Sequence, residues 1–209
     1  MAYKQFEITG KCNLGCEVCY NKELMKYFKN IEVGAVLQNV SRGDVVYLGG
    51  GEPMLHKNIE EIVQGIIDIG AEVVISTNGT IYKKIPKEAQ IQVSLWTLEP
   101  NLYKKILNGT GRQLENVLNN VKRYISDGNT LFINMPVYEA NLSEIKSVSD
   151  YADSLGVPLR INPIFPANGF SNSPDLEKKI ENSVLALRLK GRNIIYHRNK
   201  QPVERFYKC

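Results

Sequence analysis

Short apolar runs alternate with segments of helical periodicity along most of this chain. The apolar runs have the length of strands, and several are rich in β-branched residues. They predict six strands, at residues 4–9, 44–48, 72–76, 90–96, 130–135 and 159–164, and allow a final short one at 193–196. The run at 44–48 is continuously apolar after its first residue, which is typical of a buried strand.

Helical segments are expected after most of these strands, because apolar residues there recur every three or four positions. Such stripes lie at residues 59–67, 114–125 and 142–155, each ended by a glycine: Gly70, Gly128 and Gly156. Residues 22–40 and 177–189 are also helical in composition, with a break expected near Asn30 or Gly34. The segment after the third strand is polar and broken by Pro86, and 165–174 has the composition of a loop.

Repeated strand–helix units predict parallel strands joined by right-handed crossovers. About six units fall short of the eight in a closed barrel, for which about 250 residues are typical. The pattern therefore predicts an α/β fold, an open, partial (β/α)6 TIM-like barrel with mainly parallel strands. We expect one domain over 1–209, with a core at about 4–165 and a C-terminal helix and tail at 166–209.

The overall composition is ordinary for a globular protein, and no apolar run approaches the length of a membrane span. Residues 1–5 lack the apolar region of a signal peptide, so we expect a reducing, cytoplasmic location. The net charge of +4 is too small to favour nucleic acid as a partner. The basic stretch at 191–209 is interpreted as a solvated surface, with an acidic partner as the minor alternative.

Three cysteines with the spacing C-x-x-x-C-x-x-C directly follow the first predicted strand. They are Cys12, Cys16 and Cys19. Cysteine thiolates are the usual ligands of iron–sulfur clusters. Three thiolates hold three irons of a 4Fe–4S cube and leave the fourth iron open to a substrate or cofactor. The spacing therefore indicates a reactive cluster rather than a purely structural one.

Two structural alternatives fit this motif less well. A structural zinc site needs four ligands, usually in two close pairs, but Cys209 is the last residue and His56 and His197 show no zinc-ligand spacing. A disulfide framework needs many cysteines in a small secreted chain, and this chain has four in 209 residues.

The cysteine loop is one of several polar or glycine-rich segments that fall at the expected carboxyl ends of the strands. The others are residues 49–53, residues 77–79, Ser94, Asn134 and Asn162. Active sites of barrel folds gather at this end of the strands, so we expect these residues to converge. Their convergence follows from the geometry of the fold and does not depend on any family.

The glycine run Gly49-Gly50-Gly51-Glu52-Pro53 follows the second predicted strand. Gly50 and Gly51 would let the backbone adopt positive φ and approach a ligand closely. Glu52 could then accept a hydrogen bond from an ammonium group of that ligand. No Lys and Ser/Thr follow in the pattern of a phosphate-binding loop, so the run does not predict a nucleoside triphosphate.

Cys12, Cys16 and Cys19, followed by the aromatic Tyr20, resemble the signature loop of the radical S-adenosylmethionine (SAM) enzymes. In that family the open iron chelates the amino and carboxylate groups of SAM. An electron from the cluster then cleaves SAM, and the resulting 5′-deoxyadenosyl radical takes a hydrogen from the substrate. The resemblance implies a 4Fe–4S cluster and SAM as cofactors, and a core of six strand–helix units.

The resemblance also implies roles for residues outside the cysteine loop. Gly50, Gly51 and Glu52 look like the family's motif for the methionine amino group of SAM, and Thr77 and Asn78 like a segment that lines the SAM pocket. The backbone near Tyr20 lies where family members contact the adenine.

Residues of the later strands complete this implied pocket. Ser94 either faces the ribose of SAM or has its hydroxyl hydrogen-bonded within the core. On composition alone the two alternatives are about equal. Asn134 lies late in the fifth strand, and Asn162 would bound the adenine end. Trp96 stands where many family members have an aspartate. Asn141 is expected to be a helix N-cap rather than a ligand residue.

We therefore expect an enzyme that generates a 5′-deoxyadenosyl radical and acts on a peptide or small-molecule precursor, with an electron donor such as flavodoxin or ferredoxin. The alternative within the family is a glycyl-radical-enzyme activase, suggested by the short chain and by Cys19-Tyr20-Asn21. Outside the enzyme class, the alternative is a metal- or cluster-binding interaction module. Cys209 is either a free terminal thiol or the first cysteine of an extension that this chain does not continue.

Overall fold

The computed structural model describes residues 1–19, 21–23, 25, 27, 29–164, 173–196 and the backbone of 204–206. The predictions for Tyr20, His197, Cys209 and most of the loop at 165–174 lie outside the described residues.

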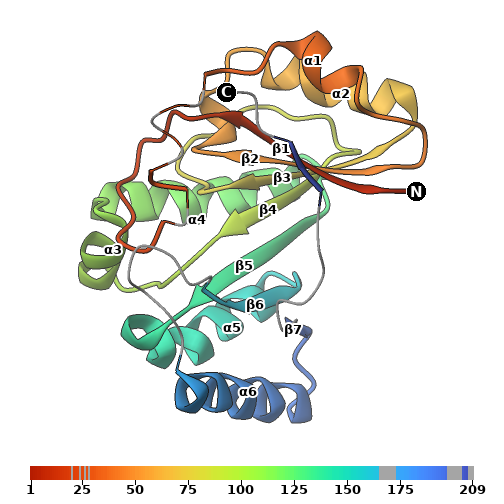
Figure 1. Cartoon of the computed structure of the whole chain (residues 1–209). Helices are drawn as coiled ribbons and strands as arrows, with labels where there is room; N and C mark the ends of the chain where they lie inside the picture. Colours follow the sequence, from red (N-terminus) through yellow and green to blue (C-terminus); the bar gives the residue numbers. More distant parts are fainter. Residues whose placement is uncertain are drawn as a thin grey trace.

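The described residues form one open sheet of eight strands in the order β7-β6-β5-β4-β3-β2-β1-β8, and all neighbouring strands are parallel (Figure 1). The strands are β1 (Tyr3–Thr9), β2 (Val45–Gly50), β3 (Glu72–Thr77), β4 (Gln90–Ser94), β5 (Leu131–Val137), β6 (Leu159–Pro163), β7 (Ile194–Tyr196) and β8 (Glu204–Phe206). The predicted α/β fold with parallel strands is confirmed.

The strand β8 was not predicted. It pairs with β1 from Lys4–Glu204 to Phe6–Phe206, so a C-terminal segment lies beside the first strand. Three residues are too few to show a periodicity, and the sequence pattern therefore carried no signal for it.

Six α-helices and two 3₁₀ turns lie among the described residues: α1 (Val33–Leu37), η2 (Pro53–Leu55), α2 (Ile59–Ile69), α3 (Pro100–Leu107), α4 (Gly111–Ser126), η3 (Glu139–Glu144), α5 (Ile145–Ser154) and α6 (Pro174–Leu189). The predicted ends are confirmed where a glycine stops the helix. Gly70 caps α2 with φ 84°, and Gly128, just after α4, has φ 86°.

One predicted helix is much shorter than expected, and one helix was missed. The segment 22–40 contains only the short α1 among its described residues, because the Ile31 amide donates to the Ile8 carbonyl of β1 instead of extending a helix. The break expected near Asn30 is found, since residues 29–32 are not helical. The helix α3 was missed. Its start carries a recognisable signal, since Pro100 occupies the first turn and the Glu99 carboxylate caps the Leu102 amide.

The helices lie around the outside of the curved sheet, and the main hydrophobic core lies between them and the strands (Figure 1). The opposite face carries a small apolar cluster of Val45, Tyr47, Val74 and Phe132. Beside it the Arg160 guanidinium lies 4.5 Å from the Phe132 ring centroid. The two faces alternate along the strands, so residues such as Asn134 lie on the face away from the helices.

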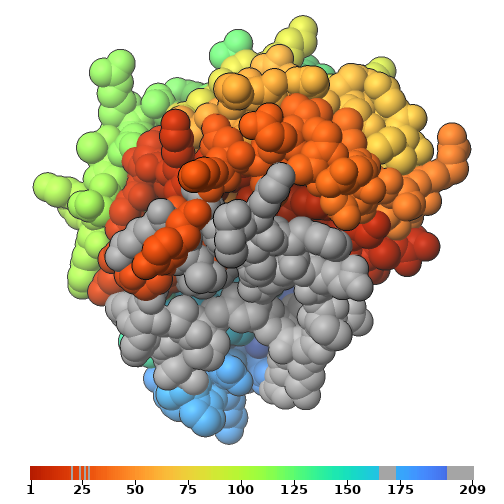
Figure 2. Space-filling view, turned by 45° about the horizontal axis from the view of Figure 1, so that its top comes forward, coloured from red at the N-terminus to blue at the C-terminus, as the bar shows by residue number. Residues whose placement is uncertain are grey.

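The ends of the sheet are far apart in space. In the space-filling view α6, in blue, lies at the opposite end of the molecule from α1 and α2, in orange and yellow (Figure 2). This agrees with the strand order, which separates β1 and β2 from β6 and β7.

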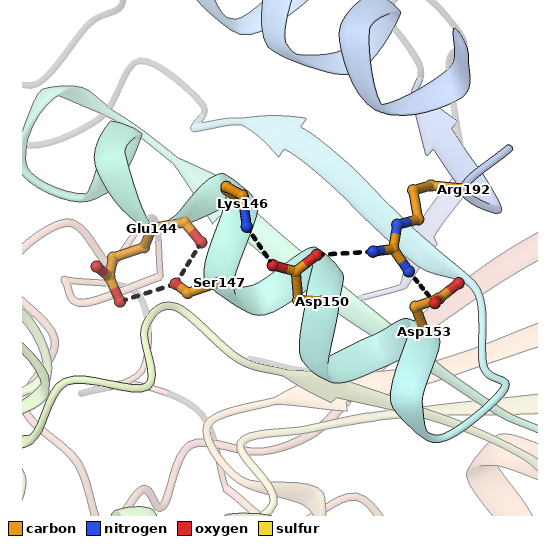
Figure 3. A network of polar contacts seen from close by, with 6 residues as sticks. All are labelled: Glu144, Lys146, Ser147, Asp150, Asp153 and Arg192. Carbon is orange, nitrogen blue, oxygen red and sulfur yellow. Dashed lines mark hydrogen bonds and ion pairs between the residues drawn. The ribbon is translucent and has the colours of Figure 1, made fainter. Parts of the chain in front are cut away.

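An ion-pair network fixes the segment after α6 against α5 (Figure 3). Asp150 accepts from Lys146 at 2.5 Å and from Arg192 at 2.9 Å, and Arg192 also pairs with Asp153. Arg192 comes just before β7, so the network positions the last strand at this edge of the sheet. Nowhere in the described ranges is there a helix long and apolar enough to cross a membrane.

Candidate cluster and cofactor site

The cysteine loop follows β1 and rests on the end of α3. The Gly15 amide donates to the Leu107 carbonyl at 3.1 Å, and the Glu17 amide donates to the Ile106 carbonyl at 2.9 Å. Carbonyls in the last turn of a helix have no partner within the helix, so α3 offers two acceptors to the loop. The missed helix α3 thus supports the predicted cluster loop.

The three cysteines of the loop form no disulfide, and each is partly buried. Burial raises the pKa of Cys12 and Cys19, and it raises the pKa of Cys16 to about 12, with the charges of Cys19 and Cys12 adding to the effect. Thiols in such surroundings keep their protons until a metal binds, because the thiolate is the metal ligand and metal binding releases the proton.

The geometry of these thiols bears on which metal group they could hold. Within the described part of the chain, no three His, Cys, Asp or Glu side chains are close enough to hold one metal ion. A cube is less demanding, because each of its three thiolates binds a different iron and the sulfurs stay farther apart. Partly buried thiols outside any disulfide, on one loop and acting on each other electrostatically, fit a cluster held by three ligands.

The glycine run after β2 brings two loops together. The Gly51 amide donates to the Thr9 carbonyl and the Glu52 amide to the Lys11 carbonyl, both at 2.7 Å. A Cβ at Gly50 would lie 2.4 Å from the Thr9 carbonyl oxygen, and one at Gly51 would lie 2.1 Å from that of Lys11. The sequence predicts a close approach to a ligand at these glycines, whereas the close approach that the structure shows is to the backbone of Thr9 and Lys11.

Positive φ was expected at both glycines and is found only at Gly50, where φ is 125°. At Gly51 a side chain is excluded for a different reason, because the Lys11 backbone leaves no space for a Cβ. Lys11 lies far from Gly51 in sequence, so the residues next to Gly51 gave no sign of this requirement.

The Glu52 side chain is fully buried and joins the loops after β2 and β3. Its Oε1 accepts from the Met54 amide at 3.0 Å and from the Thr77 hydroxyl at 2.7 Å, and its Oε2 accepts from the Asn78 amide at 2.7 Å. Burial raises the pKa of Glu52, while the three donors favour its ionised form. The structure thus shows three acceptor sites of this carboxylate filled by the chain itself.

Asn78 connects the loop after β3 to the cysteine loop. Its Nδ2 donates to Asn13 Oδ1 at 2.9 Å and lies 4.0 Å from Cys12 Sγ. Its Oδ1 accepts from the Thr80 amide and hydroxyl, and Asn13 in turn donates to Thr80. The loops after β1, β2 and β3 are therefore one hydrogen-bonded unit, in which Thr77 and Asn78 act beside Glu52.

The three predicted residues of the later strands lie side by side on the sheet. Ser94 is in register with Asn134, and Asn162 Nδ2 donates to Asn134 Oδ1 at 2.6 Å. The alternation of buried apolar residues places these side chains on the face away from the helices. They form a polar group separate from the Glu52 unit, and the structure shows no direct bond between the two groups among the described residues.

The N-cap expected at Asn141 is wrong. Asn141 lies within η3, accepts from the Tyr138 amide at 3.0 Å, and donates to the carbonyls of Trp96 and Pro136 at 2.9 Å each. It reaches back towards β4 and β5 because it is fully buried and those carbonyls lie beside it. Trp96 meets Tyr138 edge to face, with centroids 6.2 Å apart.

Sequence reasoning missed several residues that position this site. Asn13 sits inside the cysteine motif, and its polar side chain was a usable signal. Glu17 accepts from the Tyr138 hydroxyl at 3.4 Å, a contact between residues 121 positions apart that no local pattern reveals. Tyr103 of α3 packs under the same loop and is buried with 1% of its surface exposed.

The family model described as the radical SAM superfamily matches residues 6–152. The chain belongs to the radical SAM superfamily. The match runs from the second half of β1 to most of α5 and includes the cysteine loop and the loops bonded to it. Members of this superfamily use a 4Fe–4S cluster and SAM, so these cofactors follow from membership, whereas the residues that hold them here are proposals.

Curated relatives of this radical SAM chain are named as GTP 3′,8-cyclases. A probable GTP 3′,8-cyclase of Methanococcus maripaludis is 29% identical over 176 residues, covering 78% of this chain and 58% of the relative. The one of Methanocaldococcus jannaschii is 26% identical over 219 residues, covering 96% of this chain and 72% of the relative. The chain thus spans little more than half the length of several relatives that it matches.

Solved structures show the same fold at low sequence identity. Streptococcus suis SuiB bound to the precursor peptide SuiA has a TM-score of 0.75 and 14% identity, covering 94% of this chain and 48% of SuiB. The anSMEcpe structure with bound AdoMet has a TM-score of 0.68 and 15% identity, covering 93% and 63%. At these identities the likeness shows the fold of the radical SAM chain and nothing finer.

Proposed function

We propose that this protein holds a 4Fe–4S cluster on Cys12, Cys16 and Cys19 and cleaves SAM reductively. When bound, the cluster supplies the electron that splits SAM, and the 5′-deoxyadenosyl radical so formed takes a hydrogen atom from the substrate. The observation that carries this proposal is the cysteine loop itself: three partly buried thiols, none in a disulfide, on a loop held by α3 and bonded to the next two loops.

The residues around the thiols bind and orient SAM in this proposal. Gly50 and Gly51 place the backbone of the second loop against residues 9–11, and the Glu52 carboxylate fixes that loop to Thr77 and Asn78. A carboxylate offers about four acceptor positions, so one remains on Glu52 Oε2 for the ammonium of SAM. Gly50 to Glu52 thus hold the methionyl end, with Thr77 and Asn78 beside them.

The polar group on β4, β5 and β6 is assigned to the nucleoside end of SAM. Ser94, Asn134 and Asn162 are neighbours on one face and can present hydroxyl and amide groups to a ribose and an adenine. Tyr20, whose backbone completes the adenine contact in this proposal, belongs to the same cysteine loop. The whole chain is proposed to be a single radical SAM core domain.

A peptide or a small molecule is the proposed substrate, and flavodoxin or ferredoxin the proposed electron donor. The peptide candidate is suggested by what fold neighbours were solved with: SuiB with its precursor peptide, and anSMEcpe with peptides. Free thiols awaiting a cluster suit a reducing cytoplasm, which is the location we propose.

A nucleotide is the second candidate substrate, because the curated relatives are named as GTP 3′,8-cyclases. The absence of a phosphate-binding glycine loop argued against nucleoside triphosphates in the sequence, but that argument covers only one way of binding a triphosphate. Cationic side chains bind phosphates as well, so the missing loop does not decide between a peptide and a nucleotide.

One experiment tests the reaction and separates the two substrates. Anaerobically reconstituted protein is incubated with SAM and dithionite, with GTP or with a set of peptides, and 5′-deoxyadenosine is measured. We expect slow SAM cleavage without substrate and faster cleavage with one of the two classes. A colourless protein without visible absorption, or no 5′-deoxyadenosine in any arm, would contradict the proposed function.

A further inference from the structure

The phenol ring of Tyr103 lies directly under the cysteine loop. A Cβ at Gly109 would lie 2.4 Å from Tyr103 Cε1 and 3.3 Å from Leu14 Cδ2, so the ring and the loop meet at that glycine. Leu14 stands between Cys12 and Cys16. The helix α3, which carries Tyr103, also accepts the two loop amides and lies beside the red loop in Figure 1.

The Tyr103 hydroxyl is buried and has no hydrogen-bond partner among the described residues. Leaving a buried hydroxyl unpaired is unfavourable, and such groups in native proteins need an explanation. The other fully buried tyrosine, Tyr124, accepts from the Lys83 amide at 3.4 Å. A phenylalanine would fill the Tyr103 position without that penalty unless another group accepts the proton.

Groups of two neighbouring loops act on this hydroxyl electrostatically. Burial raises the pKa of Tyr103, and the charges of Cys16, then Cys12, then Glu52 raise it further. These residues come from the loops after β1 and β2, so both loops lie within electrostatic reach of the hydroxyl. It stays protonated there and can donate to a negatively charged acceptor.

We propose that the Tyr103 hydroxyl donates a hydrogen bond to a sulfur atom of the cluster held by Cys12, Cys16 and Cys19, and so raises its reduction potential. Hydrogen bonds to the sulfurs stabilise the reduced cluster, which carries the larger negative charge. Tyr103 is then a positioning and tuning residue for the first electron transfer. The inference rests on the cluster of the proposed function.

The test compares Tyr103→Phe with the wild-type protein after anaerobic reconstitution. Iron per chain is measured first, and then the midpoint potential by a dye-mediated titration followed by EPR of the reduced cluster. We expect full iron content, a more negative potential and altered EPR g-values in the variant. Tyr124→Phe, the matched control in α4, should keep the wild-type potential and spectrum.

A second variant reverses the direction of the effect. Site-specific 3-fluorotyrosine at position 103 keeps the hydroxyl and the ring but makes the hydroxyl a stronger donor. The potential should then move above the wild-type value. This variant also tests the hydrogen bond if Tyr103→Phe loses its iron, because the fluorinated side chain has nearly the same shape as tyrosine.

Thermal unfolding distinguishes a hydrogen-bond donor to the cluster from a purely structural role of Tyr103. Without the cluster, Tyr103→Phe should melt at the wild-type temperature or above it, because an unpaired hydroxyl is removed. With the cluster it should melt below the wild type. A wild-type protein that binds no cluster would overturn the proposed function, whereas unchanged potentials and spectra in both loaded variants would overturn only the role of Tyr103.

Discussion

Thr77 donates its hydroxyl hydrogen to Glu52 at 2.7 Å, and both side chains are almost completely buried. This bond, together with the Asn78 amide on the other oxygen, makes the carboxylate a link between two strand-end loops. Asn78 then reaches Asn13 in the cysteine loop. Changes at Glu52 should therefore affect all three loops of the proposed SAM site.

Glu52→Gln tests this link. The amide keeps the shape but places an NH2 group against Thr77 or Asn78, where two donors would then face each other. Charge-assisted bonds of this kind contribute about 1.5–3 kcal/mol, so SAM affinity should fall by about ten- to a hundredfold. Titration calorimetry of SAM into the anaerobic, reconstituted variant measures it.

Iron content should hardly change in Glu52→Gln, because Glu52 is not a cluster ligand in this account. Glu61→Gln is the control, since Glu61 lies on α2 and only accepts from Asn58 at the surface. Wild-type SAM affinity in a Glu52→Gln protein with full iron would remove Glu52 from the site.

Gly51→Ala tests the close approach of the second loop. Its Cβ would lie 2.1 Å from the Lys11 carbonyl oxygen, which is backbone and cannot turn away. Overpacking of this kind costs about 1–3 kcal/mol, and we expect a lower melting temperature and weaker SAM binding. Denaturant unfolding and the same calorimetry measure the two effects.

Gly34→Ala is the matched control for that substitution. Gly34 lies in α1, and a Cβ there would meet no atom within 4 Å. Alanine is favoured over glycine inside a helix by roughly 0.5–1 kcal/mol, so this variant should be as stable as the wild type or more stable. Equal destabilisation by the two alanines would show that the loop contact is unimportant.

The succession of β1 to β7 along the chain, and the place of the cysteine loop and the Gly-Gly-Glu-Pro run at the ends of β1 and β2, could be predicted because each is a pattern over neighbouring residues. Gly70 and Gly128 ended their helices as expected for the same reason. Asn141 and Tyr103 could not be assigned, since their roles come from segments distant in sequence that fold against them. The strand β8 carried no pattern, being only three residues long.

We expect the stability of the folded protein to depend on pH through Asp44, which lies just before β2. A hydrogen bond and ion pair with Lys4 at 2.8 Å, and the amides of Ser41 and Ala2, lower the pKa of Asp44 from 3.8 to about 2. The folded pKa is below the unfolded one, so the stabilisation is complete above about pH 4. It is lost as the pH falls towards 2.

Asp44→Asn should therefore lower the melting temperature at pH 7, and the difference from the wild type should shrink between pH 4 and pH 2. Asp68→Asn, an exposed change on α2, is the control. Melting curves across this range measure it, and a difference that stays constant down to pH 2 would show that the Asp44 charge is not involved.

Cys209→Ser concerns the fourth cysteine, which lies outside the described residues. Because it is far in sequence from the cysteine loop, we expect unchanged iron content and unchanged reductive SAM cleavage. Loss of either one would instead indicate that Cys209 takes part in a cluster, within one chain or between two.

In the proposed function, Cys12, Cys16 and Cys19 hold a cluster that cleaves SAM. The most direct test is the iron content and 5′-deoxyadenosine yield of reconstituted Cys16→Ala beside the wild type under dithionite. We expect about four irons per chain and SAM cleavage in the wild type, and loss of both in the variant. A Cys16→Ala protein that keeps its iron and still cleaves SAM would contradict the proposed function.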